Sequence, residues 1–209
     1  RPPRSTRKES SAASDVYKRQ GVEKLKLDSN KIRVVYGSGI QVGAKNTSIS
    51  ANKKTITHPT QIIHMGRIRK DTGMEDFISL ANQLSSDDRF SLSLMGNFDS
   101  SDKQIINLVK KCIDDGLIKK IDFNYDNIQY LRSADILLLC SKHEGMPTVI
   151  LESMANFVIP IAANIDVIDE LNEMGARIYS YEFGNIESLF GILLKIDNAS
   201  IDDREEVLA

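Results

Sequence analysis

The sequence predicts an α/β fold in which a doubly wound parallel sheet carries helices on both faces. Three observations support this. Apolar runs of strand length alternate with segments of helical spacing, glycines end several of the runs, and residues 135–140 ("DILLLC") are apolar almost throughout, as in a strand buried on both faces. Connections of this strand–helix–strand kind are right-handed and make successive strands parallel.

The first four elements follow from the spacing of apolar residues. Residues 62–65 form a short apolar run that ends at Gly66, and the apolar positions of residues 77–84 fall on one helical face. Residues 90–95 alternate between apolar and polar up to Gly96, which predicts a strand. Residues 105–113 again have helical spacing and end near a glycine, as helices commonly do.

The later elements continue the alternation. Residues 121–123 and 135–140 predict strands, and residues 128–133 predict a short helix between them. Residues 147–156 predict a helix with Pro147 at its first position, where a missing N–H costs nothing. The series ends with strands at residues 159–163 and 176–180 and helices at residues 168–174 and 186–196.

Length and composition bound the function classes. The chain has 209 residues, 41% of them hydrophobic, and 27 Lys and Arg residues stand against 29 Asp and Glu residues. This balance is typical of a globular protein and calls for no nucleic acid or other polyanion. No apolar run approaches the roughly 18 residues of a membrane span. We divide the chain into a tail (1–20), a linker and first-strand region (21–60) and a sheet domain (61–200).

The tail is basic, rich in small residues and without periodicity. It resembles translated adaptor sequence at the ends of assembled fragments, and a disordered native tail is the alternative. If the tail is non-native, we expect the natural protein to begin upstream, with an N-terminal part of its own.

Two motifs that the sequence suggests are rejected. The glycines of "IRVVYGSGIQVGA" miss the dinucleotide-binding spacing, because Val42 stands where the third glycine belongs and no helical pattern follows. The two cysteines form neither a CxxC pair nor a zinc set with the three histidines. We therefore expect no metal and no resident cofactor, and a reducing cytoplasm fits the cysteine usage.

The stretch "SKHEGMPTVILESMAN" carries the most information about function. It leaves a buried strand, turns at Gly145 and starts a helix, whose free N–H groups and positive dipole end favour an anion such as phosphate. Glu144 stands at the mouth of this site, where a carboxylate can accept hydrogen bonds from sugar hydroxyls. Glu152, in the second helical turn, either holds both hydroxyls of a ribose or belongs to the polar stripe of an amphipathic helix.

These residues resemble glycosyltransferase family 4. Glu144 and Glu152 within "EGMPTVILESMA" look like the E-x7-E signature of these retaining enzymes, which have two Rossmann-like halves (the GT-B fold). "IIHMGRIRKDTGMEDFI", "SLSLMGNF" and "LRSADILLLCS" resemble further segments of the family. The similarity covers about residues 31–190 and corresponds to the C-terminal, donor-binding half.

The resemblance implies roles for individual residues. Glu144 is the catalytic candidate and would contact the donor hexose, Glu152 would hold the ribose, and Arg67 would grip the diphosphate as a guanidinium fork. Tyr125, in the loop "NYDN", would lie near the base. The full set of candidate donor-binding residues is Gly66, Arg67, Lys70, Gly145, Met146, Pro147, Thr148 and Glu152.

Three positions depart from the family pattern. Thr72 stands where the diphosphate-binding lysine is usual, so Arg69 or Lys70 would have to replace it. Phe157 stands where a glycine usually ends the Glu152 helix, which is a poor choice if that position needs a positive φ. Cys140 replaces a common proline without evident consequence.

One charge feature favours an anionic ligand without reference to the family. Residues 31–70 contain basic residues and no acid, so this part of the surface should attract a nucleotide diphosphate. The alternative is that its lysines are simply solvated.

The resulting prediction is a retaining glycosyltransferase fragment that moves a hexose-type sugar from a nucleotide-diphosphate sugar to a glycan or a lipid-linked acceptor. A missing N-terminal half would bind the acceptor, so we expect the fragment to be inactive. The full-length protein is expected in the cytoplasm, with peripheral contact to the inner face of the membrane. The alternatives are a non-catalytic nucleotide-sugar-binding module and a GT-B epimerase or phosphorylase, since fold does not fix function.

Overall fold

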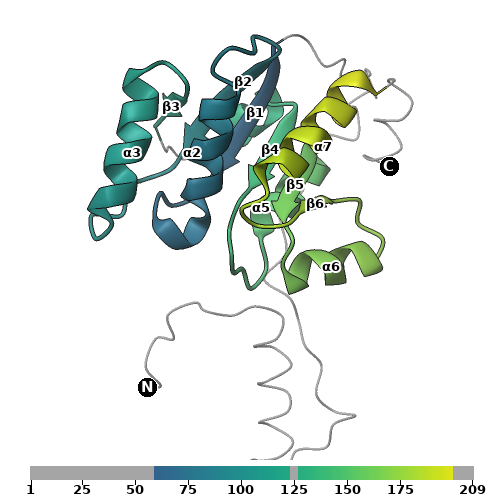
Figure 1. The fold of residues 1–209 in the computed structure, drawn as a ribbon. Helices are drawn as coiled ribbons and strands as arrows, with labels where there is room; N and C mark the ends of the chain where they lie inside the picture. The colour runs from purple at the N-terminus through teal and green to yellow at the C-terminus, as the bar shows by residue number, and fades with distance from the viewer. Residues whose placement is uncertain (1–58, 123–126, 200–209) are drawn as a thin grey trace, which may run out of the picture.

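The computed structural model describes residues 59–122 and 127–199, which form one sheet flanked by helices (Figure 1). The strands are β1 (Thr60–Met65), β2 (Phe90–Met95), β3 (Lys119–Ile121), β4 (Ile136–Leu139), β5 (Ile159–Ala163) and β6 (Tyr179–Tyr181). The helices are α2 (Met74–Gln83), α3 (Lys103–Asp114), α4 (Ile128–Ser133), α5 (Thr148–Ala155), α6 (Asp166–Glu173) and α7 (Ile186–Asn198), and a 3-10 turn, η2 (Lys70–Thr72), precedes α2.

The sheet is parallel, with strand order β3-β2-β1-β4-β5-β6. β1 pairs with β2 along its whole length, and Ile62 and Ile63 of β1 face the start of β4 on its other side. The strand order reverses between β1 and β4, because the chain returns from β3 to the far side of β1. The predicted doubly wound, Rossmann-like α/β fold is therefore confirmed.

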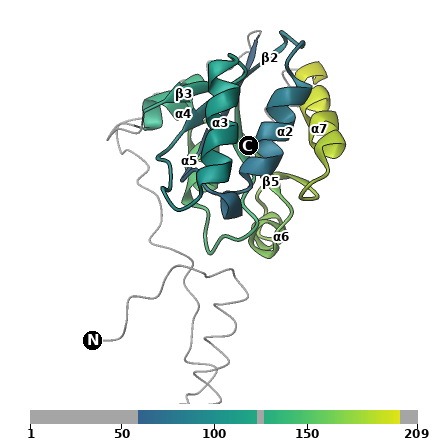
Figure 2. The ribbon, with the colours of Figure 1, turned by 60° about the vertical axis from the view of Figure 1, so that its left-hand side comes forward.

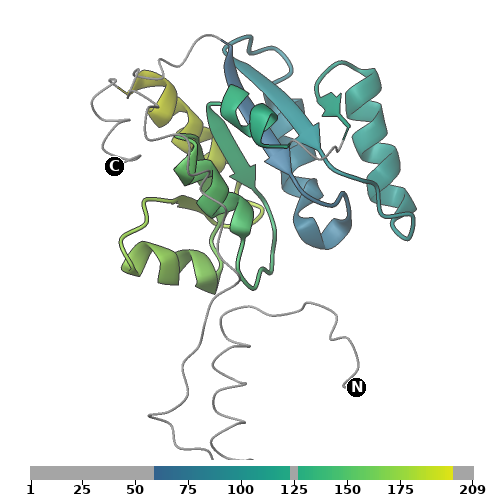
Figure 3. The same cartoon turned by 180° about the vertical axis from the view of Figure 1, so that it is seen from behind.

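Two apolar layers enclose the sheet, because successive side chains of a strand point to opposite faces. On one face, Ile62 and Leu138 pack with residues of α2, α3 and α7. On the other face, Ile63 and Leu137 pack with residues of α4, α5 and α6. Figure 1 shows the first layer of helices and Figure 3 the second, while Figure 2 shows α2 between α3 and α7. Strands covered on both faces explain the continuous apolar run of β4.

Several predicted boundaries need correction. Pro147 is the residue that caps α5 and not its first helical residue, because its ψ of 85° is far from helical. β3 begins at Lys119 and ends at Ile121, whereas residue 123 of the predicted strand lies outside the described residues. β6 starts at Tyr179, three residues later than predicted, and α6 starts at Asp166, two residues earlier. Apolar periodicity also gave no sign of η2.

Two further features concern the described residues. No helix within residues 59–122 and 127–199 is both long enough and apolar enough to cross a membrane. Cys112 and Cys140 are buried free thiols, and burial raises the pKa of the Cys140 thiol to about 12. A thiol in this state is not a reactive nucleophile at neutral pH.

Candidate functional site

Three loops meet at the edge of the sheet where the central strands end. They follow β1 (residues 66–73), β2 (residues 96–102) and β4 (residues 140–147). Because β1 and β4 are the strands between which the order reverses, their carboxyl ends flank the crevice where ligands bind in open α/β sheets.

Backbone hydrogen bonds attach the first loop to the second. The N–H of Gly66 donates to the carbonyl of Met95 at 3.0 Å, and the N–H of Ile68 donates to Asn97 at 2.9 Å. Ile68 is fully buried, whereas its neighbour Arg67 is exposed. The loop therefore presents the Arg67 side chain outward from a fixed backbone.

Arg67 and Glu144 are close enough to interact electrostatically. Burial raises the pKa of the Glu144 carboxyl, a hydrogen bond from Ser141 lowers it, and the charges of Arg67 and Arg69 lower it further, while Asp71 raises it. The charge partners of Glu144 thus come from the loop after β1, more than 70 positions earlier in the chain. A half-buried carboxylate among cations is suited to accept hydrogen bonds from a polyol beside an anion.

Arg67 differs from Arg69 in its ion pairing. Within the described residues its guanidinium forms no ion pair at 4.0 Å or less, whereas Arg69 pairs with Asp71 and lies 4.0 Å from Asp99. Arg67 is consequently available to a ligand, and Arg69 is largely neutralised.

Lys70 has an acidic partner for its backbone N–H and another for its side-chain ammonium. Its N–H donates to the Asp102 carboxylate at 2.6 Å, and its Nζ lies 3.6 Å from Glu75 Oε1. The ammonium is mostly exposed, with 66% of the side chain accessible. Solvent therefore weakens any attraction that Lys70 exerts on an anion.

The loop after β4 leads into α5 without a side-chain cap. Gly145 and Met146 are half-buried, Pro147 is buried and Thr148 is exposed. Met146 packs against the apolar layer of α4, α5 and α6, which holds the loop against the sheet. The N–H of Ile150 already donates to the carbonyl of Pro147 at 2.9 Å, so only the N–H groups before Ile150 are left for water or a ligand at this edge.

Glu152 is half-buried on α5, and its backbone carbonyl accepts a hydrogen bond from the Asn156 amide at 2.8 Å. Among the contacts of the described residues, none joins its carboxylate to Arg67 or Glu144. The ribose role of Glu152 stays a prediction, as does the convergence of all three residues on one cleft.

The backbone at Phe157 confirms the concern raised by the sequence. Its φ is 58°, which makes it the only residue other than glycine with a positive φ in the described part of the chain. The residue is 41% exposed. A bulky residue is strained in this conformation.

Several residues of interest lie outside the described part of the chain or were not predicted from the sequence. Tyr125 and the basic residues numbered 31 to 54 lie outside the described residues. Lys142, which follows β4 two residues before Glu144, was not predicted to act, although its place in the loop after a buried strand was a usable signal. Among residues 59–122 and 127–199, no three His, Cys, Asp or Glu side chains are grouped to hold a metal ion.

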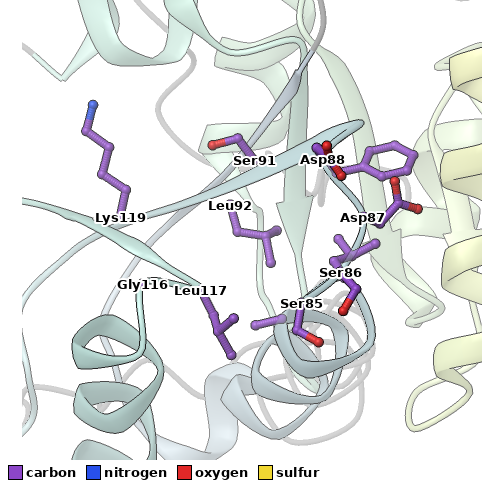
Figure 4. Close-up of a pocket in the computed structure, with 12 residues that line it drawn as sticks. Ser85, Ser86, Asp87, Asp88, Ser91, Leu92, Gly116, Leu117 and Lys119 are labelled. Atoms are coloured by element: carbon purple, nitrogen blue, oxygen red, sulfur yellow. The ribbon is translucent and has the colours of Figure 1, made fainter.

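A pocket of about 370 Å³ lies at the opposite edge of the sheet, where β2 and β3 begin (Figure 4). Its lining comes from the segment after α2 (Ser85 to Asp88), the start of β2 and the segment around Leu117. Because this edge carries the amino ends of the strands, the pocket is separate from the candidate site.

Comparisons with known proteins agree with this fold. An Anabaena protein solved with UDP (Alr3699/HepE) matches with a TM-score of 0.72 and 18% identity, over 96% of this chain and 56% of that one. A glycosyltransferase from Rickettsia africae matches with a TM-score of 0.66 and 20% identity, over 93% and 56%. The C-terminal domain of a Francisella tularensis glycosyl transferase group 1 protein (LpcC) matches with a TM-score of 0.56 and 22% identity, over 71% and 80%.

The chain therefore spans just over half the length of the first two structures, and its Rossmann-like sheet matches part of the fold of these GT-B glycosyltransferases. A search of curated proteins gave no match. The profile of the family described as "Glycosyl transferases group 1" matches residues 46–204, which is most of the sequence. This chain belongs to the glycosyl transferases group 1 family.

Proposed function

We propose that the chain is the donor-binding part of a retaining glycosyltransferase, which moves a hexose-type sugar from a nucleotide-diphosphate sugar to a glycan or lipid-linked acceptor. The observation that carries the proposal is the approach of Arg67 to Glu144 at the switch point of the sheet. The Anabaena structure, which contains UDP, supports a nucleotide donor.

Each side chain contributes a different interaction. Arg67 binds the diphosphate with its guanidinium fork, and the first turn of α5 adds backbone N–H groups. Glu144 accepts hydrogen bonds from hydroxyls of the hexose. In the transfer, the bond from the anomeric carbon to the diphosphate oxygen breaks, a bond to the acceptor oxygen forms, and the proton of the acceptor hydroxyl passes to the departing diphosphate. The cations at the site stabilise the charge that develops on the diphosphate.

The acceptor is bound by a second half that this chain does not supply. Two observations support this part of the proposal. The chain covers 56% of the Anabaena protein, and it also matches the C-terminal domain of the Francisella tularensis protein. A closed cleft excludes water and orients both substrates. We accordingly propose that this chain alone binds a donor without transferring sugar, and that the full-length protein works in the cytoplasm at the inner face of the membrane.

Isothermal titration of the 209-residue chain with UDP, GDP and ADP tests nucleotide binding. One of the three should bind, and Arg67→Ala should weaken it by about tenfold or more, because a charge-assisted hydrogen bond is lost. Arg89→Ala is the matched control, since Arg89 pairs with Asp87 at the other edge of the sheet. If the unaltered chain binds none of the three nucleotides, the proposal is wrong.

A second comparison separates the role of Glu144 from that of Arg67. Glu144→Gln should bind the free nucleotide as the unaltered chain does, but should bind the corresponding nucleotide sugar less tightly, because only the sugar contacts Glu144. Equal loss for both ligands would contradict this role. Sugar transfer by the chain alone would refute the two-half arrangement, whereas donor binding without transfer by the full-length protein would favour a non-catalytic binding module.

A further inference from the structure

Position 72 cannot supply the positive charge that the family resemblance leads one to expect there. Thr72 closes its own turn instead. Its hydroxyl accepts from the N–H of Arg69 at 3.4 Å and lies 2.8 Å from the carbonyl of Arg67 and 2.7 Å from that of Arg69. Thr72 therefore holds the shape of the Arg67 loop without contributing a cation.

Lys142 lies beside this uncharged position. Its N–H donates to the carbonyl of Asp71 at 3.4 Å, so the loop after β4 runs directly along the turn that contains Thr72. Its Nζ lies 3.3 Å from Glu75 Oε2, at the start of α2. The backbone thus brings a lysine from a different strand next to the place where the lysine is missing.

Two contacts hold the Lys142 ammonium in place. Besides the Glu75 carboxylate, its Nζ lies 4.1 Å from the ring centroid of Phe183, a geometry in which the ring face attracts a cation. Phe183 belongs to the loop after β6, and this loop is itself tied to α2, because the N–H of Gly184 donates to Asp76 at 2.9 Å. The ammonium is therefore positioned by two elements outside its own loop, α2 and the loop after β6.

The charge balance leaves Lys142 able to exchange partners. The Nζ atoms of Lys70 and Lys142 both lie on the carboxylate of Glu75, at 3.6 Å and 3.3 Å. If Lys142 turns to an anion, Glu75 keeps Lys70 and is not left unpaired. The side chain of Lys142 is 34% exposed, against 66% for Lys70, so its charge is less weakened by solvent.

Resting on the function proposed above, we propose that Lys142 provides the second cation for the donor diphosphate, together with Arg67. The earlier candidates for this role fit less well, because Arg69 is paired with acidic side chains and Lys70 is largely in solvent. Lys142 and Glu144 then act from the same loop, one on the diphosphate and one on the sugar.

The test compares Lys142→Gln with the unaltered chain by isothermal titration, using whichever of UDP, GDP and ADP binds. Gln keeps part of the aliphatic stem over Phe183 but removes the charge. We expect affinity for the nucleotide to fall by about tenfold or more, and Lys142→Arg to restore most of it. The corresponding nucleoside, followed by ligand-observed NMR, should bind both chains equally, because it has no phosphate.

Lys195→Ala is the matched control, because Lys195 also lies over an aromatic ring, 5.7 Å from the centroid of Tyr179, at the start of β6. It should bind the nucleotide as the unaltered chain does. If Lys142→Gln binds as tightly as the unaltered chain while Arg67→Ala does not, Lys142 is a structural strap and the inference is wrong, although the proposed function stands. If Lys142→Gln weakens nucleoside and nucleotide equally, the loss is structural and the inference is again wrong.

Discussion

Gly73, the residue that caps α2, lies directly against the carbonyl of Cys140 at the end of β4. A Cβ added to Gly73 would meet the Cys140 oxygen at 1.8 Å and its carbonyl carbon at 2.5 Å. This close approach joins the loop that carries Arg67 to the loop that carries Glu144. The candidate site therefore depends on a glycine that contacts no ligand in our proposal.

Replacing Gly73 by alanine should strongly destabilise the protein. The backbone cannot shift without separating α2 from β4, and the φ of 73° is itself unfavourable for alanine. We expect the free energy of unfolding, measured in urea, to fall by about 3 kcal/mol or more. Gly116→Ala is the control, because Gly116 has a φ of 75° and nothing within 4 Å of an added Cβ. Similar losses for the two variants would contradict a special contact at Gly73.

Replacing Phe157 by glycine should stabilise the protein by about 0.5–1 kcal/mol. Glycine adopts a positive φ without strain, and we expect the strain that is removed to exceed the cost of ordering the more flexible glycine on folding. Phe157→Ala separates the backbone effect from the loss of the ring, because alanine keeps the strain. In thermal unfolding the glycine variant should melt above both other proteins, and an alanine variant that melts as high would show that the ring and not the backbone matters.

The stability of the protein should fall as the pH is lowered from 6.5 to about 4, because of His64. This residue is 1% exposed, and its Nδ1 donates to the carbonyl of Leu138 at 3.0 Å. Its buried Nε2 has no partner among the described residues. Burial lowers the pKa of His64 from 6.5 to about 4, so the imidazole is neutral in the fold while the unfolded chain takes up a proton.

Protonation of His64 in the unfolded chain therefore lowers the free energy of unfolding by about 3 kcal/mol once the pH is below 4. His64→Leu should lose this pH dependence, although it is less stable at pH 7.5. Urea unfolding at several pH values measures the free energy of unfolding of both chains. The contributions of other titrating groups cancel when the two values at each pH are subtracted. An unchanged dependence in the variant would assign the effect to other residues.

Replacing Glu144 by glutamine should raise stability at neutral pH. Burial raises the pKa of Glu144, so the fold binds its proton more tightly than the unfolded chain does, and this contribution is lost as the pH rises from 4.5 through the folded pKa. The melting temperature of Glu144→Gln should therefore exceed that of the unaltered chain at pH 7.5 and approach it at pH 4. A variant that is less stable at pH 7.5 would show that attraction to Arg67 and Arg69 outweighs the cost of burial.

The candidate site could be predicted only in part. The loops after β1 and β4 were expected to matter because each follows an apolar run. Phe157 could be identified as a misfit because the family resemblance implies a glycine at the end of this helix, and its φ is positive. The place of Lys142 in a loop after a buried strand was a signal, but its role could not be assigned from the sequence, since its partner Glu75 is 67 positions away on another element. His64 gave no signal either, because its environment is set by β4 and α2.

The sequence by itself determined the order and type of the elements and the parallel, doubly wound sheet. These follow from apolar spacing within short segments and from the handedness of strand–helix–strand connections, which are properties of the local chain. Only the tertiary structure decided which loops meet, because strand order places β4 beside β1 and brings Arg67 to Glu144 and Lys142 to Glu75. Such contacts arise from the packing of whole elements, and spacing along the chain does not encode them.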